Sequence, residues 1–220
     1  MMLDPSTTPR ARLGRARLLL LWTRELCAGE PVEWLRRAVA GGVDIVQVRE
    51  KKMTGRELYG ATREARAALA GTSALVMVND RADVALAARA DGVHVGQDDL
   101  EVADAVALLR GGGLLVGAST HSLAQVREAC AAGASLLGFG PMFETATKPS
   151  EPPIGPAELA AAVGASTVPV FAIGGLDAAR ISAIGARRAA ISSAILRAAD
   201  PQRAAREIRA ALEANGPLDE

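Results

Sequence analysis

The chain is poor in cysteine, has no excess of charge of either sign, and contains no apolar run of membrane-spanning length. Its 220 residues include two cysteines, and 25 lysines and arginines balance 25 aspartates and glutamates. With a formal net charge of zero, no global field favours nucleic acid or an anionic membrane as partner. The longest purely apolar run near the N-terminus, Leu18 to Trp22, is far too short to cross a bilayer. We therefore expect neither a nucleic-acid partner nor membrane association.

The two cysteines, Cys27 and Cys130, lack the spacing of a metal site, and neither has a histidine close by in the sequence. We expect two free thiols rather than a disulfide. No small-residue cleavage pattern follows a basic start, so no secretory signal is predicted. A cytoplasmic location is the default expectation.

Half of the composition is apolar, which suffices for a substantial core in a single domain. Short apolar runs alternate with helical stretches rich in alanine, leucine, arginine and glutamate. The runs span 18–22, 44–48, 74–78, 92–95, 114–117, 135–139, 168–172 and 188–192. Several of them lack two-residue alternation, as expected for parallel strands covered on both faces. This pattern predicts an α/β fold, a single-domain (β/α)8 TIM barrel, rather than a doubly wound sheet with fewer strands.

The composition of the two ends differs from that of the centre. Residues 1–15 are rich in proline, threonine and arginine, and we expect a flexible N-terminal arm there. Residues 16–213 are expected to form the barrel, which is the catalytic domain, and residues 214–220 a loose tail. The sequence leaves a homo-oligomer open.

Two of the apolar runs end in acidic side chains, Asp80 in the first and Asp98-Asp99 in the second. In a closed parallel barrel the functional groups come from the carboxyl ends of the strands, so these carboxylates are expected to converge. Mg²⁺ prefers oxygen ligands and is usually held by one or two carboxylates, which makes Asp80 and Asp99 candidate metal ligands. Helix capping, by Asp80 for a helix over 81–90 and by Asp98 for one over 100–110, explains the same residues equally well.

Cations and an amide follow the second run. Because side chains alternate along a strand, Ile45, Gln47, Arg49 and Lys51 are predicted to face the barrel interior, and Val46 and Val48 the helices. An arginine can grip two phosphate oxygens at once, so this face suits an anionic substrate.

Hydroxyls and two histidines lie near the fourth and fifth strand ends. Ser119 could donate to a substrate, and Ser122 is expected to cap the next helix. His121 could act as a general base, but its position beside a helix cap favours a structural role. His94, within a strand, is interpreted as a packed histidine.

The last three strands are followed by loops with anion-binding character. Residues 138–149 form a long loop with a cation and two hydroxyls, expected to be a lid or an anion clamp. Gly174-Gly175 and Ser192-Ser193 follow the seventh and eighth runs, where such barrels commonly bind phosphate.

Seven segments of the chain, in the same order, resemble the thiamine phosphate synthases, which share their barrel with the thiazole tautomerases. The matching segments are Gln47 to Lys51, Asn79 to Arg81, Gly92 to Asp99, Ser119 with His121, Gly138 to Lys148, Ile173 to Gly175, and Ser192-Ser193. The resemblance implies a pyrimidine diphosphate site made of Gln47, Val48, Arg49, Glu50, Lys51, Asn79, Ser119 and Lys148. It implies a thiazole phosphate site made of Thr145, Ala146, Thr147, Gly175, Ser192 and Ser193. Mg²⁺ would be the cofactor, bound by Asp80 and Asp99, and catalytic roles would fall to Arg49, Lys51, Ser119 and Lys148.

The reaction implied by the resemblance joins 4-amino-2-methyl-5-hydroxymethylpyrimidine diphosphate to a thiazole phosphate, giving thiamine phosphate and pyrophosphate by a dissociative path. Two alternatives remain open. A thiazole tautomerase would use His121 for proton transfer, and the segment Phe143-Glu144-Thr145 favours it, whereas a tautomerase would not need the Asp99 segment or the complete Gln-x-Arg-Glu-Lys motif. A non-catalytic sensor of a thiamine precursor would not need both Asp80 and Asp99.

Overall fold

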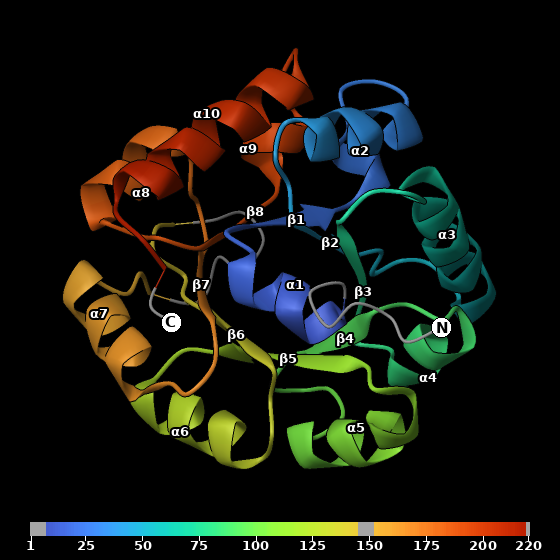
Figure 1. The fold of residues 1–220 in the computed structure, drawn as a ribbon, viewed down its shortest axis with the longest axis horizontal. Coiled ribbons are helices and arrows are strands. Elements are labelled where there is room, and N and C mark those ends of the chain that lie inside the picture. The colour runs from blue at the N-terminus through green and yellow to red at the C-terminus, as the bar shows by residue number, and fades with distance from the viewer. Residues whose placement is uncertain (1–7, 145–151, 219–220) are drawn as a thin grey trace.

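A computed structural model describes residues 8–144 and 152–218 as an eight-stranded closed barrel (Figure 1). Every neighbouring pair of strands is parallel, and β8 pairs with β1, so that Leu18 lies opposite Ala189. The strands are β1 Leu18–Trp22, β2 Ile45–Val48, β3 Leu75–Asn79, β4 Gly92–Val95, β5 Leu115–Thr120, β6 Leu136–Phe139, β7 Val170–Ile173 and β8 Ala189–Ile191. The predicted barrel is confirmed, and each strand overlaps one predicted run.

The helices lie around the barrel, except for α1, which lies across its centre (Figure 1). They are α1 Pro9–Arg15, α2 Pro31–Ala40, α3 Gly55–Ala68, α4 Ala82–Ala87, α5 Val102–Leu109, α6 Leu123–Ala131, α7 Pro156–Ala165, α8 Ala178–Ile184, α9 Ser193–Leu196 and α10 Pro201–Ala214, with short 3₁₀ turns at η2 Arg24–Leu26 and η3 Arg110–Gly112. Local signals set their ends: Thr54 and Glu57 form a capping box at the start of α3, and Gly185, with φ of 66°, ends α8. Among the described residues no helix has the length and apolarity needed to cross a membrane.

Alternation along the strands divides the apolar side chains into two layers. Leu19, Ile45 and Phe171 belong to a cluster that fills the barrel interior. Val46 and Val48 belong to the larger cluster between the sheet and the helices. The orientation predicted for β2 from its sequence is therefore confirmed.

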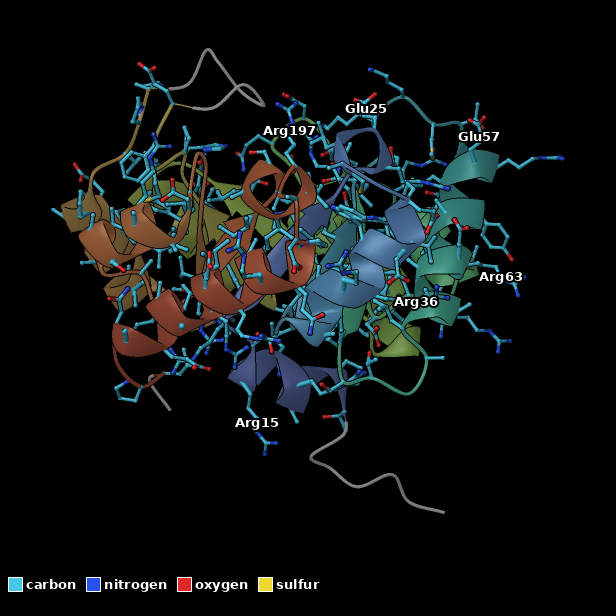
Figure 2. The ribbon with its side chains drawn as sticks, turned by 90° about the horizontal axis from the view of Figure 1, so that it is seen from above. Arg15, Glu25, Arg36, Glu57, Arg63 and Arg197 are labelled. Carbon is cyan, nitrogen blue, oxygen red and sulfur yellow. The ribbon has the colours of Figure 1, made fainter. Side chains whose placement is uncertain are left out.

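The end of the barrel where the strands begin is closed by helix α1. Leu13 and Ala16 are 2% and 1% exposed and pack with the interior cluster. Figure 2 places α1, with Arg15, at the end of the molecule opposite Glu25 and Arg197. This corrects the expectation of a flexible arm over residues 1–15: residues 9–15 are a packed helix, because the interior cluster would otherwise face water. Residues 1–7 lie outside the described part, and the other domain limits stay predictions.

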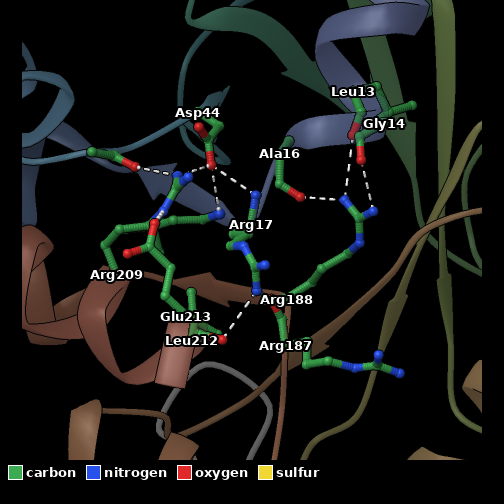
Figure 3. A network of polar contacts seen from close by, with 12 residues as sticks. Leu13, Gly14, Ala16, Arg17, Asp44, Arg187, Arg188, Arg209, Leu212 and Glu213 are labelled. Atoms are coloured by element: carbon green, nitrogen blue, oxygen red, sulfur yellow. Dashed lines mark hydrogen bonds and ion pairs between the residues drawn. The ribbon is translucent and has the colours of Figure 1, made fainter. Parts of the chain in front are cut away.

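Arginine and aspartate side chains fasten this closed end (Figure 3). The Arg188 guanidinium donates to the carbonyl oxygens of Leu13, Gly14 and Ala16 at the C-terminal end of α1, where helix carbonyls run short of backbone donors. Asp44 Oδ2 accepts from Arg209 Nη1 at 2.6 Å and from the backbone amides of Arg17 and Leu18 at 2.7 and 3.0 Å. One carboxylate oxygen thus joins the start of β1, the approach to β2 and helix α10.

We expect Asp44→Ala to lower the free energy of unfolding by about 2–3 kcal/mol, since two backbone amides and a guanidinium lose their acceptor. Urea denaturation followed by circular dichroism measures this loss. Asp44→Asn keeps an acceptor, so its free energy of unfolding should lie between those of Asp44→Ala and wild type. Asp104→Ala, at an exposed position on α5, should lose little stability. Equal stability of Asp44→Ala and wild type would contradict the role of this carboxylate.

Cys27 and Cys130 are both free thiols, as predicted. Burial raises the pKa of Cys27 to about 11. Burial also acts to raise the pKa of Cys130, but hydrogen bonds with Ser166 and Thr167 outweigh it and leave that pKa below its usual value. The two thiols therefore differ in the fraction present as the reactive thiolate at neutral pH.

At pH 8 we expect iodoacetamide to modify Cys130 at least about tenfold faster than Cys27, after allowing for the lower intrinsic nucleophilicity of the more acidic thiol. Timed alkylation followed by peptide mass spectrometry gives both rates in one sample. Raising the pH should speed modification of Cys27 up to its pKa of about 11. Modification of both thiols at one rate at pH 8 would refute the difference.

Candidate active site

A cavity of about 280 Å³ opens where the strands end, and residues from all eight strands or their following loops line it. It gathers ten of the residues predicted to bind substrate or metal. These are Gln47, Arg49, Lys51, Asn79, Asp80, Asp99, Ser119, Gly175, Ser192 and Ser193. Strand ends far apart in the sequence thus meet as the barrel geometry predicts.

Two residues of the β2 motif have side chains elsewhere. Val48 is fully buried in the layer beneath the helices. Glu50 Oε1 accepts from the backbone amide of Arg24 at 2.7 Å, and burial raises the pKa of Glu50. The prediction that these two side chains line the substrate site is therefore corrected. Alternation along the strand turns both away from the cavity, and Glu50 instead joins the loops after β1 and β2. Thr145, Ala146, Thr147 and Lys148 lie outside the described residues.

The two predicted metal ligands meet at the rim. The pKa of Asp80 is raised, chiefly by burial and next by contact with the Asp99 carboxyl, while Lys51 acts in the opposite direction. Lys51 Nζ lies 3.1 Å from Asp80 Oδ2. Asp99 Oδ2 accepts from the Gly96 amide at 2.7 Å, which fixes that carboxylate from the other side.

Helix capping does not account for these acids. The N-cap residues are Arg81 for α4 and Glu101 for α5, and neither helix has a side-chain cap bond. The capping interpretation of Asp80 and Asp98 is therefore wrong. Asp80 also has φ of 64°, an uncommon backbone conformation for a residue other than glycine. The backbone turns sharply where the Asp80 carboxylate joins the cavity lining.

The carboxylate pair suits a hard cation. Two carboxylates in contact in a half-buried place repel each other, and a bound cation would relieve that repulsion. Among residues 8–144 and 152–218 there is no group of three or more histidine, cysteine, aspartate or glutamate side chains that could hold a metal. A two-carboxylate set fits Mg²⁺, which completes its coordination with water and substrate phosphates, better than Zn²⁺.

Deeper in the cavity lie an amide and a histidine. Gln47 is 1% exposed, and its buried Oε1 has no hydrogen-bond partner within the described structure. His94, interpreted from the sequence as a packed histidine, is buried but lines the cavity, and its Nε2 lies 3.1 Å from Ser119 Oγ. The glycine at position 117, in the neighbouring strand, is a sequence signal for the position of the His94 ring. A Cβ there would lie 2.4 Å from His94 Nδ1, so only glycine fits.

Sequence reasoning missed a chain of amides beside His121. Gln97 Nε2 donates to the Ser119 carbonyl at 2.7 Å, and Gln125 Nε2 donates to Gln97 Oε1 at 2.9 Å. The backbone amide of His121 donates to Gln125 Oε1 at 2.7 Å, and His121 Nδ1 lies 2.5 Å from the Gly140 carbonyl oxygen. This arrangement agrees with the structural role expected of His121. Ser122 caps α6, as predicted.

The opposite side of the rim presents backbone groups. Gly174 and Gly175 have φ of 100° and 64°, and a Cβ on Gly175 would lie 2.7 Å from the Glu144 carbonyl oxygen. The amides of Gly175 and Leu176 donate to no acceptor in the described structure. Ser192 and Ser193 line the same cavity. Free amides and hydroxyls together can bind an oxyanion.

An α/β barrel with paired carboxylates, cations and free amides around one cavity defines an enzyme of the class that binds phosphorylated small molecules. The thiamine monophosphate synthase family model matches residues 18–195. A thiamine-phosphate synthase of Anaeromyxobacter dehalogenans is 45% identical over 209 residues, covering 93% of this chain and 90% of the relative. One of Gloeobacter violaceus is 41% identical, covering 88% of this chain, which spans only 57% of that longer relative.

A solved structure agrees. Thiamine phosphate pyrophosphorylase from Pyrococcus furiosus has a TM-score of 0.82 and 34% identity, covering 94% of this chain and 98% of that one. The chain belongs to the thiamine monophosphate synthase family. The resemblance seen in its sequence segments is confirmed.

Proposed function

We propose that the barrel joins a hydroxymethylpyrimidine diphosphate to a thiazole phosphate, giving thiamine phosphate and pyrophosphate. The observation that carries this proposal is that one cavity brings together two groups of residues that suit anions. Asp80, Asp99 and Lys51 form a cluster suited to a metal-bound diphosphate, and Gly175 with Ser193 offers amide and hydroxyl donors suited to a phosphate.

The chemistry follows from the bonds that change. The bond between the pyrimidine methylene carbon and the diphosphate oxygen breaks, its electron pair leaves with pyrophosphate, and the thiazole nitrogen lone pair forms the new carbon–nitrogen bond. That nitrogen carries no proton, so no general base is needed. The main barrier is the negative charge that develops on the departing oxygens. Donors placed in advance around the diphosphate lower it.

The cationic side chains of β2 are placed for this task. Arg49 and Lys51 line the cavity from one strand end, two residues apart and on the same face. Arg49 makes no ion pair with any described residue and so remains available to phosphate oxygens. Lys51 already contacts Asp80 and would contact both the carboxylate and the leaving group. Ser119 and Asn79 add neutral donors to the same wall.

The deep end of the cavity suits a pyrimidine ring. The unpartnered Gln47 Oε1 accepts hydrogen bonds, and an aminopyrimidine carries an N–H donor that would satisfy it. A buried acceptor left unsatisfied in the free protein is costly, so its pairing on binding would favour the matching ligand.

Asp80 and Asp99 would hold Mg²⁺. When bound, the ion would supply positive charge to the diphosphate leaving group. Lys51 would favour the ionised form of Asp80, because its ammonium group opposes the rise in that pKa caused by burial and by Asp99. The Gly96 amide would keep Asp99 in place.

The assignment is tested by mixing the purified chain with the pyrimidine diphosphate, a thiazole phosphate and Mg²⁺, and measuring thiamine phosphate. We expect one pyrophosphate for each thiamine phosphate. Absence of product from well-folded wild-type chain would overturn the proposal, and binding of a precursor without turnover would instead support a sensor.

The thiazole tautomerase is the second candidate, favoured by the position of His121 in the cavity lining. A tautomerase reaction involves no diphosphate, so it would give the Asp80 and Asp99 pair no role. Interconversion of thiazole carboxylate phosphate tautomers, lost in His121→Ala, would establish that activity. The cytoplasmic location and a homo-oligomer stay predictions.

A further inference from the structure

Arg180, on the first turn of α8, lies behind the glycines that form the phosphate side of the cavity. Its side chain is half-exposed and does not line the cavity. Its Nη1 donates to the Gly175 carbonyl oxygen at 2.5 Å. Its guanidinium carbon lies 4.8 Å from the centre of the Phe143 ring, within the range of a cation–π contact. Arg180 therefore contacts both the glycine loop after β7 and the loop after β6.

The two loops that Arg180 joins are already paired through their backbones. The Met142 amide donates to the Ile173 carbonyl at 2.8 Å, and the Phe143 amide donates to the Gly174 carbonyl at 3.2 Å. A Cβ on Gly175 would lie 2.9 Å from the Cβ of Phe143, so the loops touch closely. Phe143 also packs against the main apolar cluster. The guanidinium contacts a residue on each side of this junction.

The bond to the Gly175 carbonyl has a consequence for the next amide. The carbonyl and N–H of a trans peptide point in opposite directions. With the Gly175 carbonyl held by Arg180, the Leu176 N–H is turned away from the guanidinium, and it donates to no described acceptor. Leu176 lines the cavity, as does Gly175. Arg180 thus fixes the orientation of a peptide group that borders the cavity without entering it.

We propose that Arg180 and Phe143 act together as a positioning pair for the phosphate of the thiazole substrate. The pair holds the Gly175 peptide so that its neighbouring amides meet the phosphate, and it holds the β6 loop against the same glycines. This inference rests on the proposed function. It predicts an effect on one substrate only, because in the described structure no hydrogen bond or ion pair joins either residue to Asp80 or Gln47.

The test compares Michaelis constants for the two substrates in the purified enzyme with Mg²⁺. In Arg180→Met we expect the KM for the thiazole phosphate to rise about five- to tenfold, the usual effect of losing a partly exposed charge-assisted hydrogen bond. The KM for the pyrimidine diphosphate should stay within about twofold. Arg203→Met, an exposed arginine on α10, serves as the matched control and should change neither constant.

Phe143→Leu separates positioning from direct contact with phosphate, because it leaves the guanidinium charge and its bond to Gly175 in place. We expect it to raise the same KM, and the double variant to be less affected than the product of the two single effects. An Arg180→Met enzyme with both constants unchanged, or with both raised equally, would overturn the inference. So would a Phe143→Leu enzyme identical to wild type, which would assign Arg180 to direct phosphate binding. Wild type without turnover would instead refute the proposed function.

Discussion

Replacing either Asp80 or Asp99 by alanine is expected to lower kcat/KM for thiamine phosphate formation about 100- to 1000-fold, the usual effect of removing one preorganised electrostatic contact to a transition state. The reason is that the charge developing on the leaving group is the main barrier. Each substitution would remove one of the two carboxylates that hold the cation beside that group. Initial rates over a series of Mg²⁺ concentrations measure the loss. Asp104→Asn removes an exposed acid from α5 and should match wild type. Undiminished turnover in both alanine variants would refute the metal pair.

A second measurement separates a lost ligand from a damaged fold. Because the pKa of Asp80 is raised, its carboxyl holds a proton more tightly in the folded protein than in the unfolded chain. The stability of the fold therefore falls as the pH rises from the unfolded pKa of this group through its folded pKa. Asp99→Asn removes a charge that contributes to this shift while keeping an oxygen for the Gly96 amide. In EDTA at pH 8 we therefore expect Asp99→Asn to melt above wild type although it is nearly inactive. A lower Tm would contradict the repulsion between the two acids.

Removing the charge of Lys51 is the second large effect. We expect Lys51→Gln to lower kcat/KM about 100-fold, because a cation beside the departing oxygens is lost. The pH profile should change as well. Lys51 lowers the pKa of Asp80, so without it that pKa rises and the acid limb of kcat/KM moves to higher pH. Rates measured between pH 5 and 9 give both quantities.

Lys52 provides the matched control for Lys51. It is the next residue, with a side chain 85% exposed and paired with Glu25 outside the cavity. Lys52→Gln removes the same charge from the same turn and should keep wild-type kcat/KM and pH profile. Equal losses in the two variants would mean that the general field of the loop matters, and not the position of Lys51.

The parts of the site that follow strand periodicity were predictable from the sequence. Ile45, Gln47 and Arg49 face the interior because alternation has a period of two, and the acids of β3 and β4 meet because parallel strands end on one rim. Capping by Asp98 was wrong because α5 begins later, with Glu101 as its N-cap, and a cap residue acts only next to its helix. Helix starts are set by local competition that a pattern of acids does not resolve.

Contacts between distant segments account for the rest. The burial of α1 depends on Arg188 and on interior side chains supplied by every second strand position, which no local composition reveals. The position of the His94 ring depends on Gly117 in the next strand, where a side chain would collide with the ring. Arg180 and Phe143 come from separate loops. Each of these contacts joins segments that are brought together only when the barrel closes.

Closure of one end of the barrel by α1 affects the order in which the substrates bind. Because Leu13 and Ala16 close the lower end, the described barrel exchanges ligands with solvent through the rim alone. Gln47 is buried, whereas Gly175 and Ser193 are more accessible at the strand ends, so a ligand bound first at the rim would hinder entry of a ring to Gln47. We therefore expect compulsory binding order, with the pyrimidine diphosphate first, and competitive inhibition of the pyrimidine substrate by compounds that fill the depth of the cavity.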